Sequence, residues 1–524
     1  MRKLELNRKT IIAILATIIL LQSILYLIVA SNKSYIHIDE GYSYGLINYD
    51  KVEITNNQDF YNMWHDKEYY TDYLTISSEE SVDWTPVYEQ QKNDVHPPFY
   101  YLLLRVANSF NLNNFSVWPG IILNIIIHIG ITIFTYLISS KLLNNKLYGL
   151  VISLVGGLTV ATLETILLTR MYALTALGIL AITHLHMANL EKEKIDIKNL
   201  VAIGICAVLG SLTHYYYLVF LAVLYVIYLI RYIIRKQYKN AINYTITMVI
   251  SAVVSLIIFP YSFVHMFMGY RGQGMLSNLT NVKMAWEGIG TYLGLTITNV
   301  YNGFLVIILI TTIAILIYEY IRKKEISIKI TNKYLAIIVL PTLIYFIIIA
   351  MGTPYKEIRY IMPIIPLLFI IGVYGFKTVL HKVYSERTIN TIMLASIAVL
   401  LITPIILNWN ITYLYPDMKE IVNELEEKHE TPALYIFNQD CNRFMDDLYL
   451  FTKLDKSYIM DSKLANADEI NRVLSSADMA NGIILFINSN LQNDDYINII
   501  LNETKLEKCE YMKRLNACDM YYLY

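Results

Sequence analysis

Long apolar segments recur along this chain of 524 residues and constrain its fold more than any other feature. A membrane-spanning helix needs about 20 predominantly apolar residues. The chain is 56% hydrophobic and only 16% charged, whereas soluble domains have about 25% charged residues, which excludes a wholly soluble protein. We predict eleven spanning segments, of which the fifth is short: 10–30, 117–139, 147–164, 171–188, 200–212, 215–234, 241–263, 299–321, 333–351, 359–376 and 390–408.

The charges of the short loops predict how these segments are oriented. Lys and Arg concentrate in cytoplasmic loops. With a cytoplasmic N-terminus, the cytoplasmic stretches contain 21 Lys and Arg residues, and the opposite short loops contain five. We therefore predict a multi-pass protein of the cell membrane, with loop 31–96 and the C-terminal region outside. The first segment could instead be a cleaved signal peptide, but it is long for one and no A-x-A site follows it.

Charge also divides the chain into two predicted domains. Residues 417–524 contain 11 basic and 20 acidic residues, whereas the rest of the chain has a net charge of +8. The acidic region alternates strand-like and helix-like stretches, as a small α/β domain does, and no glycine-rich phosphate loop follows its first strand. We expect a transmembrane domain over 1–410 and an extracytoplasmic α/β domain over 417–524. The total charge of −1 does not indicate a nucleic-acid partner.

Four cysteines are too few to define a disulfide framework. Cys206 lies in an apolar segment, and the C-terminal region contains Cys441, Cys509 and Cys518 without any C-x-x-C spacing for a metal. Cys509 and Cys518 could pair if the last two strands form a hairpin, or they could be buried as small apolar side chains.

Ionisable residues are costly at membrane depth and usually mark a site or a pathway there. In this chain they gather at the predicted outer face. Asp39 and Glu40 follow the first apolar segment closely, and shielding from water can raise the pKa of a carboxyl group towards the range of a general base. The simpler alternative is a pair of solvated loop acids. The same loop ends in DVHPPFYY, residues 94–101, where two prolines suit a helix start and hold His96 in place.

Cationic and aromatic residues occupy three further outer positions. Arg170 lies between two apolar segments, and its planar guanidinium group suits phosphate oxygens. Lys356, Arg359 and Tyr360 lie at the outer mouth of the tenth segment, and His214 begins a run of aromatic residues. Taken singly, these could be a snorkelling arginine, an interfacial anchor and an aromatic belt. Together, acidic and cationic motifs converge on one mouth of the bundle, as a site for a membrane-embedded anion and a hydroxyl acceptor would require.

These motifs resemble the GT-C membrane glycosyltransferases, in particular glycosyltransferase family 39 and its bacterial relatives, which include protein O-mannosyltransferases and aminoarabinose transferases. The resemblance covers about residues 1–410, keeps the order of the motifs, and leaves the C-terminal region unexplained. It implies a polytopic α-helical membrane protein of GT-C type with about 11 transmembrane helices. The motifs that carry it are Asp39-Glu40, HPPFYY at 96–101, RMYAL at 170–174, and Arg359-Tyr360 with Pro363 and Pro366.

The resemblance also implies inverting transfer of a sugar from a polyprenyl-phosphate donor to an acceptor hydroxyl at the outer face. Asp39 would be the general base, and Glu40 would position it or bind the acceptor, although Asp83 and Asp94 in the same loop leave the choice of base open. Fixed cations would stabilise the phosphate charge that develops in the transition state. The expected donor-phosphate ligands are Arg170, Lys356, Arg359 and Tyr360, and the expected substrate-binding residues are His96, Tyr101, Tyr172 and His214.

The expected partners are the lipid bilayer, the polyprenyl-phosphate-sugar donor and a protein, lipid or wall-polymer acceptor. No cofactor is expected. His37, Asp39, Glu40 and His96 could assemble a divalent metal site, but metal dependence is not general among these relatives, and none is predicted. An acceptor-selecting role for the C-terminal domain is a further hypothesis.

Two other functions could use the same residues. A membrane transporter or flippase for a lipid-linked or polar substrate would line a path with them, but the charges gather at one face, and no inverted repeat is evident. A scaffold that recruits partners through its acidic C-terminal region would leave Asp39 and Arg170 replaceable.

Overall fold

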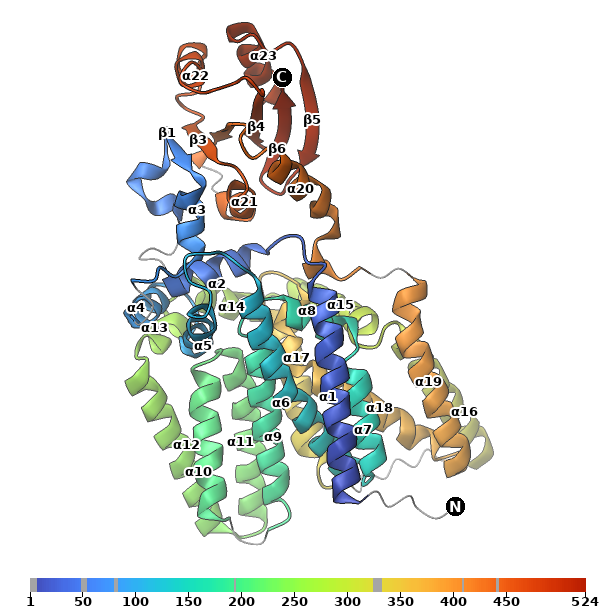
Figure 1. Cartoon of the computed structure of the whole chain (residues 1–524). Coiled ribbons are helices and arrows are strands. Elements are labelled where there is room, and N and C mark those ends of the chain that lie inside the picture. Colours follow the sequence, from blue (N-terminus) through green and yellow to red (C-terminus); the bar gives the residue numbers. More distant parts are fainter. Residues whose placement is uncertain are drawn as a thin grey trace.

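A bundle of long helices carries a small α/β domain at one end (Figure 1). The first turn of α1 lies at the other end of the bundle. The computed structural model describes residues 7–48, 54–79, 83–192, 195–323, 332–407, 410–439 and 443–524.

Eight of the described helices are long and apolar enough to cross a membrane. Each corresponds to one of the segments predicted from hydropathy, so the polytopic helical architecture is confirmed. These helices are α1 (Arg8–Ala30), α6 (Trp118–Leu142), α11 (Tyr216–Ile234), α12 (Tyr238–Ile258), α16 (Phe304–Lys323), α17 (Leu335–Gly352), α18 (Ile365–Leu380) with the turn before it, and α19 (Glu386–Ile406).

The other three predicted segments also form helices, but the eleven spans are not all recovered. The helices α7 (Lys146–Gly156) and α8 (Val160–Leu167) reach the length of a span only as a pair, which is bent by 59°. The side chain of Thr159 caps α8 by accepting a hydrogen bond from the N–H of Thr162, so a new helix starts there. The helices α9 (Tyr172–Asn189) and α10 (Ile197–Ser211) are not among the eight.

The predicted outer loop is a folded region that lies between the bundle and the α/β domain (Figure 1). Its main elements are α2 (Ile38–Asn48), β1 (Met63–Asp66), α3 (Lys67–Leu74) and α4 (Thr85–Asn93), and α5 (Phe99–Asn108) follows it. Three short helices from the middle of the chain lie at the same end of the bundle: α13 (Tyr261–Phe267), α14 (Tyr270–Leu279) and α15 (Val282–Leu295).

The C-terminal region contributes β2 to β6 to a six-stranded sheet with the order β1-β3-β2-β4-β6-β5. The central strands β3, β2 and β4 are parallel, and β6 and β5 continue the sheet as an antiparallel hairpin. The predicted alternation of strands and helices is confirmed. The elements are α20 (Lys419–Glu427), β2 (Ala433–Phe437), α21 (Phe444–Phe451), β3 (Lys456–Asp461), α22 (Ala467–Leu474), β4 (Ile483–Asn488), α23 (Asn493–Glu503), β5 (Cys509–Arg514) and β6 (Cys518–Leu523).

The sheet does not consist of the C-terminal region alone. The outer-loop strand β1 pairs antiparallel with β3, with Met63 opposite Ile459 and Asp66 opposite Lys456. This strand completes one edge of the sheet, where unpaired backbone groups would otherwise face solvent. The α/β unit therefore includes part of the 31–96 loop, which the predicted boundary at 417 separated from it.

The α/β domain also packs directly on the helix that carries Asp39. The helix α21 contacts α2, and the hydroxyl of Tyr35 donates a hydrogen bond of 2.7 Å to the backbone carbonyl of Asp446. One continuous apolar core runs from the bundle into this domain and includes Tyr70, Phe444 and Phe486. The two regions therefore form a single packed structure.

The described cysteines do not form a disulfide bond. Cys206, Cys509 and Cys518 are free. In the terminal hairpin Cys509 lies opposite Leu523, so Cys509 and Cys518 are at opposite ends of the two strands. Their pairing, which the sequence left open, does not occur, and Cys518 is instead a buried side chain. Cys441 lies outside the described residues.

Candidate functional site

Asp39 and Glu40 lie in the first turn of α2. Glu40 Oε2 accepts a hydrogen bond of 2.9 Å from the backbone N–H of His37, which satisfies one of the free donors at this helix start. Successive residues of an α-helix point about 100° apart. The two adjacent carboxylates therefore face different neighbours.

Glu40 belongs to a fully enclosed ion pair. Its Oε2 lies 2.8 Å from Lys33 Nζ, and the two side chains are 0% and 1% exposed. Its Oε1 accepts a 3.0 Å hydrogen bond from the backbone N–H of Thr169, the residue before Arg170. Glu40 thus connects α2 to the segment that carries Arg170. This placement gives it a positioning contact, and we assign it no contact with substrate.

Asp39 lies between two arginine side chains. Its Oδ2 is 3.2 Å from Arg359 Nη1, and its Oδ1 is 3.9 Å from Arg170 Nη2. Arg170 lies between α8 and α9, and Arg359 lies in a short 3-10 turn, Ile358–Tyr360, before α18. The arginine side chains are 6% and 7% exposed, whereas that of Asp39 is 18% exposed. The convergence of these three residues, predicted from separate motifs, is present in the structure.

Both arginines have further partners and unused donors. Arg170 Nη1 donates to the hydroxyls of Tyr101 (2.8 Å) and Ser43 (3.3 Å), and Arg359 Nη1 lies 2.6 Å from Glu357 Oε2. Within the described part of the chain, the buried Nε of each arginine has no hydrogen-bond partner. Buried unpaired donors are rare and costly. Each guanidinium group therefore retains capacity to bind an anion.

The ion pairs dominate the protonation of Asp39. Burial raises the pKa of the Asp39 carboxyl group, but the guanidinium groups of Arg170 and Arg359 outweigh it and hold that pKa well below its usual range. Burial also lowers the pKa of both arginines, and the negative groups around them, Asp39 included, more than compensate. Asp39 is therefore an anion at neutral pH when only these side chains surround it.

His37 lies beside the same carboxylate. Its Nε2 is 3.1 Å from Arg359 Nη1, its Nδ1 is 3.0 Å from the backbone N–H of Asp39, and both neighbours are donors. A neutral imidazole has one acceptor nitrogen, so it can satisfy only one of these donors at a time. Burial lowers the pKa of His37 to about 4, which keeps the ring neutral at pH 7.

A wall of aromatic and histidine side chains extends from this cluster. His96 Nδ1 lies 2.8 Å from Asp94 Oδ2, so Asp94 orients the imidazole. The ring of His96 lies 5.8 Å from that of His214, which lies 5.6 Å from that of Tyr172, and Tyr172 meets Tyr360 edge to face at 6.2 Å. Three of the four residues predicted to bind substrate, His96, His214 and Tyr172, therefore pack in succession, and the fourth, Tyr101, contacts Arg170.

Lys356 does not join this group. Its Nζ donates to the backbone carbonyls of Ala350 (2.9 Å) and Thr353 (2.6 Å), so it satisfies free carbonyl groups at the end of α17. Burial lowers the pKa of this ammonium group. Its place among the expected donor-phosphate ligands is not supported by these contacts, because its hydrogen-bonding capacity is largely used locally.

Three contacts of the cluster were not among the predicted site residues: Ser43, Glu357 and Lys33. Ser43 follows Asp39 by four residues, and this helical spacing places it on the same face of α2. Glu357 precedes Arg359 by two residues and appeared in the sequence only as part of a charged stretch. Lys33 precedes Glu40 by seven residues, and the turn between α1 and α2 brings the two side chains together.

No three His, Cys, Asp or Glu side chains gather as a metal site in the residues that the structure describes. His37 and Asp39 are neighbours, but Glu40 is engaged by Lys33, and His96 by Asp94. These four residues are therefore not arranged as a common ligand set.

No family model and no curated protein matches the chain. Similar solved structures include ArnT from Cupriavidus metallidurans bound to undecaprenyl phosphate, with 10% identity, 97% of each chain covered and a TM-score of 0.49. ArnT from the same organism in the apo state has 10% identity, covers 95% of this chain and 97% of its own, and has a TM-score of 0.41. The archaeal oligosaccharyltransferase AglB from Archaeoglobus fulgidus, in complex with an inhibitory peptide and a dolichol-phosphate, has 10% identity, 93% and 71% coverage and a TM-score of 0.43.

Proposed function

We propose that this protein is a membrane glycosyltransferase that moves a sugar from a polyprenyl-phosphate donor to an acceptor hydroxyl. The observation that carries the proposal is a nearly buried carboxylate, Asp39, held between two guanidinium groups that each keep an unused donor. Such a site brings together a group that can accept a proton and two groups that can bind a phosphate. Both are required when a sugar leaves a phosphate and joins a hydroxyl.

Arg170 and Arg359 would bind the donor phosphate. When the bond between the sugar and the phosphate oxygen breaks, the phosphodiester becomes a monoester and gains negative charge. Fixed guanidinium groups in a water-poor site stabilise that charge more in the transition state than in the ground state. The Tyr101 hydroxyl orients Arg170 through its 2.8 Å hydrogen bond, and the rings of Tyr172 and Tyr360 pack edge to face beside the arginines.

Asp39 would be the general base. The acceptor oxygen attacks the anomeric carbon as Asp39 takes the hydroxyl proton, and the phosphate leaves from the opposite side, so the configuration inverts. A donor phosphate that takes over the guanidinium groups removes the interactions that depress the pKa of Asp39. The bound donor would therefore make Asp39 a better base for the acceptor.

The same proposal places the reaction outside the cell, with the N-terminus in the cytoplasm and the α/β domain extracytoplasmic. The helix α2, which carries Asp39, lies with the folded outer loop and the α/β domain at one end of the bundle, and α1 begins at the other. A donor with a long isoprenoid tail can reach this end from within the bilayer. The two guanidinium groups supply the positive charge, and we assign no role to a cofactor.

Mass spectrometry of membrane lipids and glycosylated products, with and without the protein, tests this proposal. We expect one polyprenyl-phosphate sugar to accumulate in cells that lack the protein, and one glycosylated protein, lipid or wall polymer to disappear. The variant Asp83→Asn alters an exposed acid of the same loop and should behave like the wild type. Unchanged lipid-linked sugars and unchanged products would contradict the transferase assignment. Movement of an intact lipid-linked sugar across the membrane, with no new glycosidic bond, would favour the flippase alternative.

A further inference from the structure

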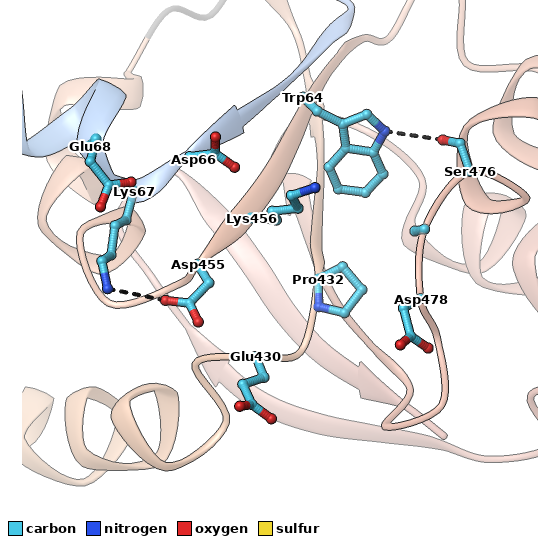
Figure 2. A pocket seen from close by; sticks show the side chains of 11 residues that line it. Trp64, Asp66, Lys67, Glu68, Glu430, Pro432, Asp455, Lys456, Ser476 and Asp478 are labelled. Atoms are coloured by element: carbon cyan, nitrogen blue, oxygen red, sulfur yellow. Dashed lines mark hydrogen bonds and ion pairs between the residues drawn. The ribbon is translucent and has the colours of Figure 1, made fainter.

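A cleft of about 500 Å³ lies where the outer loop meets the α/β domain (Figure 2). Its volume is within the range of small-ligand sites. None of its lining residues belongs to the Asp39 cluster. The transfer chemistry proposed above makes no use of this cleft.

We propose that this cleft binds a saccharide that has free hydroxyl groups and no acidic groups. The chemical basis is the combination of one half-buried indole with several polar side chains that form no ion pair among the described residues, all around a single cavity. The residues that carry the proposal are Trp64, Asp66, Glu68, Glu430, Lys456 and Asp478.

Trp64 provides a flat apolar surface that is held in one orientation. Its indole N–H donates a 3.2 Å hydrogen bond to Ser476 Oγ, and its ring meets that of Tyr458 edge to face at 5.4 Å. Figure 2 shows the indole nitrogen of Trp64 joined to Ser476 by this hydrogen bond. The C–H faces of pyranose rings pack favourably on such an aromatic surface, while their hydroxyls remain free for hydrogen bonds.

The polar side chains around Trp64 suit hydroxyl groups. In the described part of the chain, Asp66, Glu68, Glu430 and Asp478 form no ion pair, and neither does Lys456. Carboxylates accept hydrogen bonds and an ammonium group donates them, so a ligand that both donates and accepts can satisfy them all. Hydroxyl groups do both. Because acidic side chains outnumber basic ones along the lining, a sulfated or phosphorylated saccharide would be repelled.

The cleft is held together across two distant parts of the sequence. Asp66 lies opposite Lys456 in the pairing of β1 with β3, and Lys67 Nζ forms an ion pair of 3.2 Å with Asp455. Ligand binding therefore requires little ordering of the walls, which lowers its entropic cost.

Trp64 and Asp39 also lie in the same folded outer loop. A saccharide bound in the cleft is consequently on the side of the bundle where the transfer is proposed to occur. If the proposed function holds, the cleft would retain a glycan acceptor, but binding in the cleft does not depend on that function.

Fluorine NMR of the full-length protein labelled with 5-fluorotryptophan tests the proposal. The chain has five tryptophans, so Trp64→Phe identifies the Trp64 resonance. The probes are cellohexaose and maltohexaose as neutral saccharides, a sulfated heparin hexasaccharide, and hexalysine. We expect a saturable shift of the Trp64 resonance with at least one neutral hexasaccharide and none with the sulfated one. Isothermal titration calorimetry measures the affinity of the variants, because Trp64→Ala lacks the reporting resonance: Trp64→Ala should weaken the binding by about tenfold or more, and Glu430→Gln should weaken it less.

Two controls separate this result from folding and from catalysis. Trp84 is another exposed tryptophan of the outer loop and does not line the cleft, so Trp84→Ala should bind as the wild type does. Asp39→Asn should also bind normally, because the assay needs no turnover. The absence of any shift with the neutral saccharides at millimolar concentration, or a shift with hexalysine alone, would overturn the proposal.

Discussion

Two adjacent carboxylates, Asp39 and Glu40, have opposite environments. Glu40 is completely enclosed, and Lys33, His37 and Thr169 satisfy its oxygens. Asp39 is partly exposed and faces two guanidinium groups whose Nε atoms have no partner among the described residues. An ion pair whose hydrogen bonds are all formed is suited to fixing the fold, whereas a pair with unused donors is suited to binding a ligand. The difference assigns structure to Glu40 and chemistry to Asp39.

The largest effect on activity is expected for Asp39→Asn. The amide keeps the size of the side chain but cannot accept the acceptor proton, so kcat should fall about 10²- to 10⁴-fold. A transfer assay on membranes, with protein level measured in parallel, checks this. If Asp39→Asn retains near wild-type kcat while Asp94→Asn does not, the base is Asp94, and the assignment of the chemistry to Asp39 is wrong.

Glu40→Gln should mainly reduce stability. Removing one partner of an enclosed pair leaves the ammonium group of Lys33 buried without its counter-ion, which costs about 3–5 kcal/mol. Thermal unfolding of the detergent-solubilised protein measures this. Asp39→Asn should cost less, because Arg359 keeps Glu357 and the site is partly open to water. An equal loss of stability in both variants would contradict the division of roles.

The free energy of unfolding should depend on pH through His37. Burial lowers its pKa in the folded protein to about 4, whereas an unfolded chain has a histidine pKa of about 6.5. Between these values the unfolded state binds more protons, so the free energy of unfolding falls as the pH is lowered through this window. The loss is about 3 kcal/mol at most. His37→Asn should flatten part of the dependence, and His381→Asn, more exposed and far along the chain, should not. An unchanged slope in His37→Asn would contradict the buried neutral imidazole.

Replacing the arginines should affect the donor more than the fold. Arg359→Lys removes the planar donor set that contacts Asp39 at 3.2 Å, and we expect a loss of about 10- to 100-fold in kcat/KM for the donor. Arg170→Lys should have a similar or smaller effect, since its contact with Asp39 is longer, at 3.9 Å. Lys356→Gln is the matched control, because the Nζ of Lys356 binds backbone carbonyls. A larger loss of donor affinity in Lys356→Gln would reverse this assignment.

The smallest expected effect is that of Tyr35→Phe. It removes the hydrogen bond from the Tyr35 hydroxyl to the carbonyl of Asp446, which joins the connection before α2 to α21. One such bond contributes about 1 kcal/mol. A small decrease in unfolding temperature with an almost unchanged kcat would show that the α/β domain supports α2 without taking part in the reaction. A large decrease in kcat would place the domain closer to the chemistry.

Features that depend on local pattern could be predicted from the sequence. Apolar segments long enough to span a bilayer form helices because lipid leaves backbone groups no other partner. The alternation of strands and helices after residue 417 is likewise a local signal. The meeting of Asp39, Arg170 and Arg359 was predictable because each lies just outside an apolar segment at the same face.

Features that depend on residues far apart in the sequence, or on the direction of a single side chain, could not be predicted from the sequence. The four residues of β1 are too few to show a strand pattern, and their partners in β3 follow about 390 residues later in the chain. Lys356 is equivalent to Arg359 in charge and in its place in the sequence, but it follows the end of α17, and its Nζ folds back onto the carbonyls of Ala350 and Thr353. The difference between Asp39 and Glu40 depends on which way each points, and adjacency in the sequence does not reveal it.

The pairing of β1 with β3 has a consequence for how the molecule is made. The outer loop emerges from the ribosome early, but the strand it needs is among the last parts to be synthesised. Until β3 and α21 have been synthesised, β1 has no strand to pair with and α2 lacks the contact with α21. A nascent chain therefore inserts its helices before the contacts of β1 with β3 and of α2 with α21 have formed. A truncated chain would remain in the membrane without these contacts around Asp39.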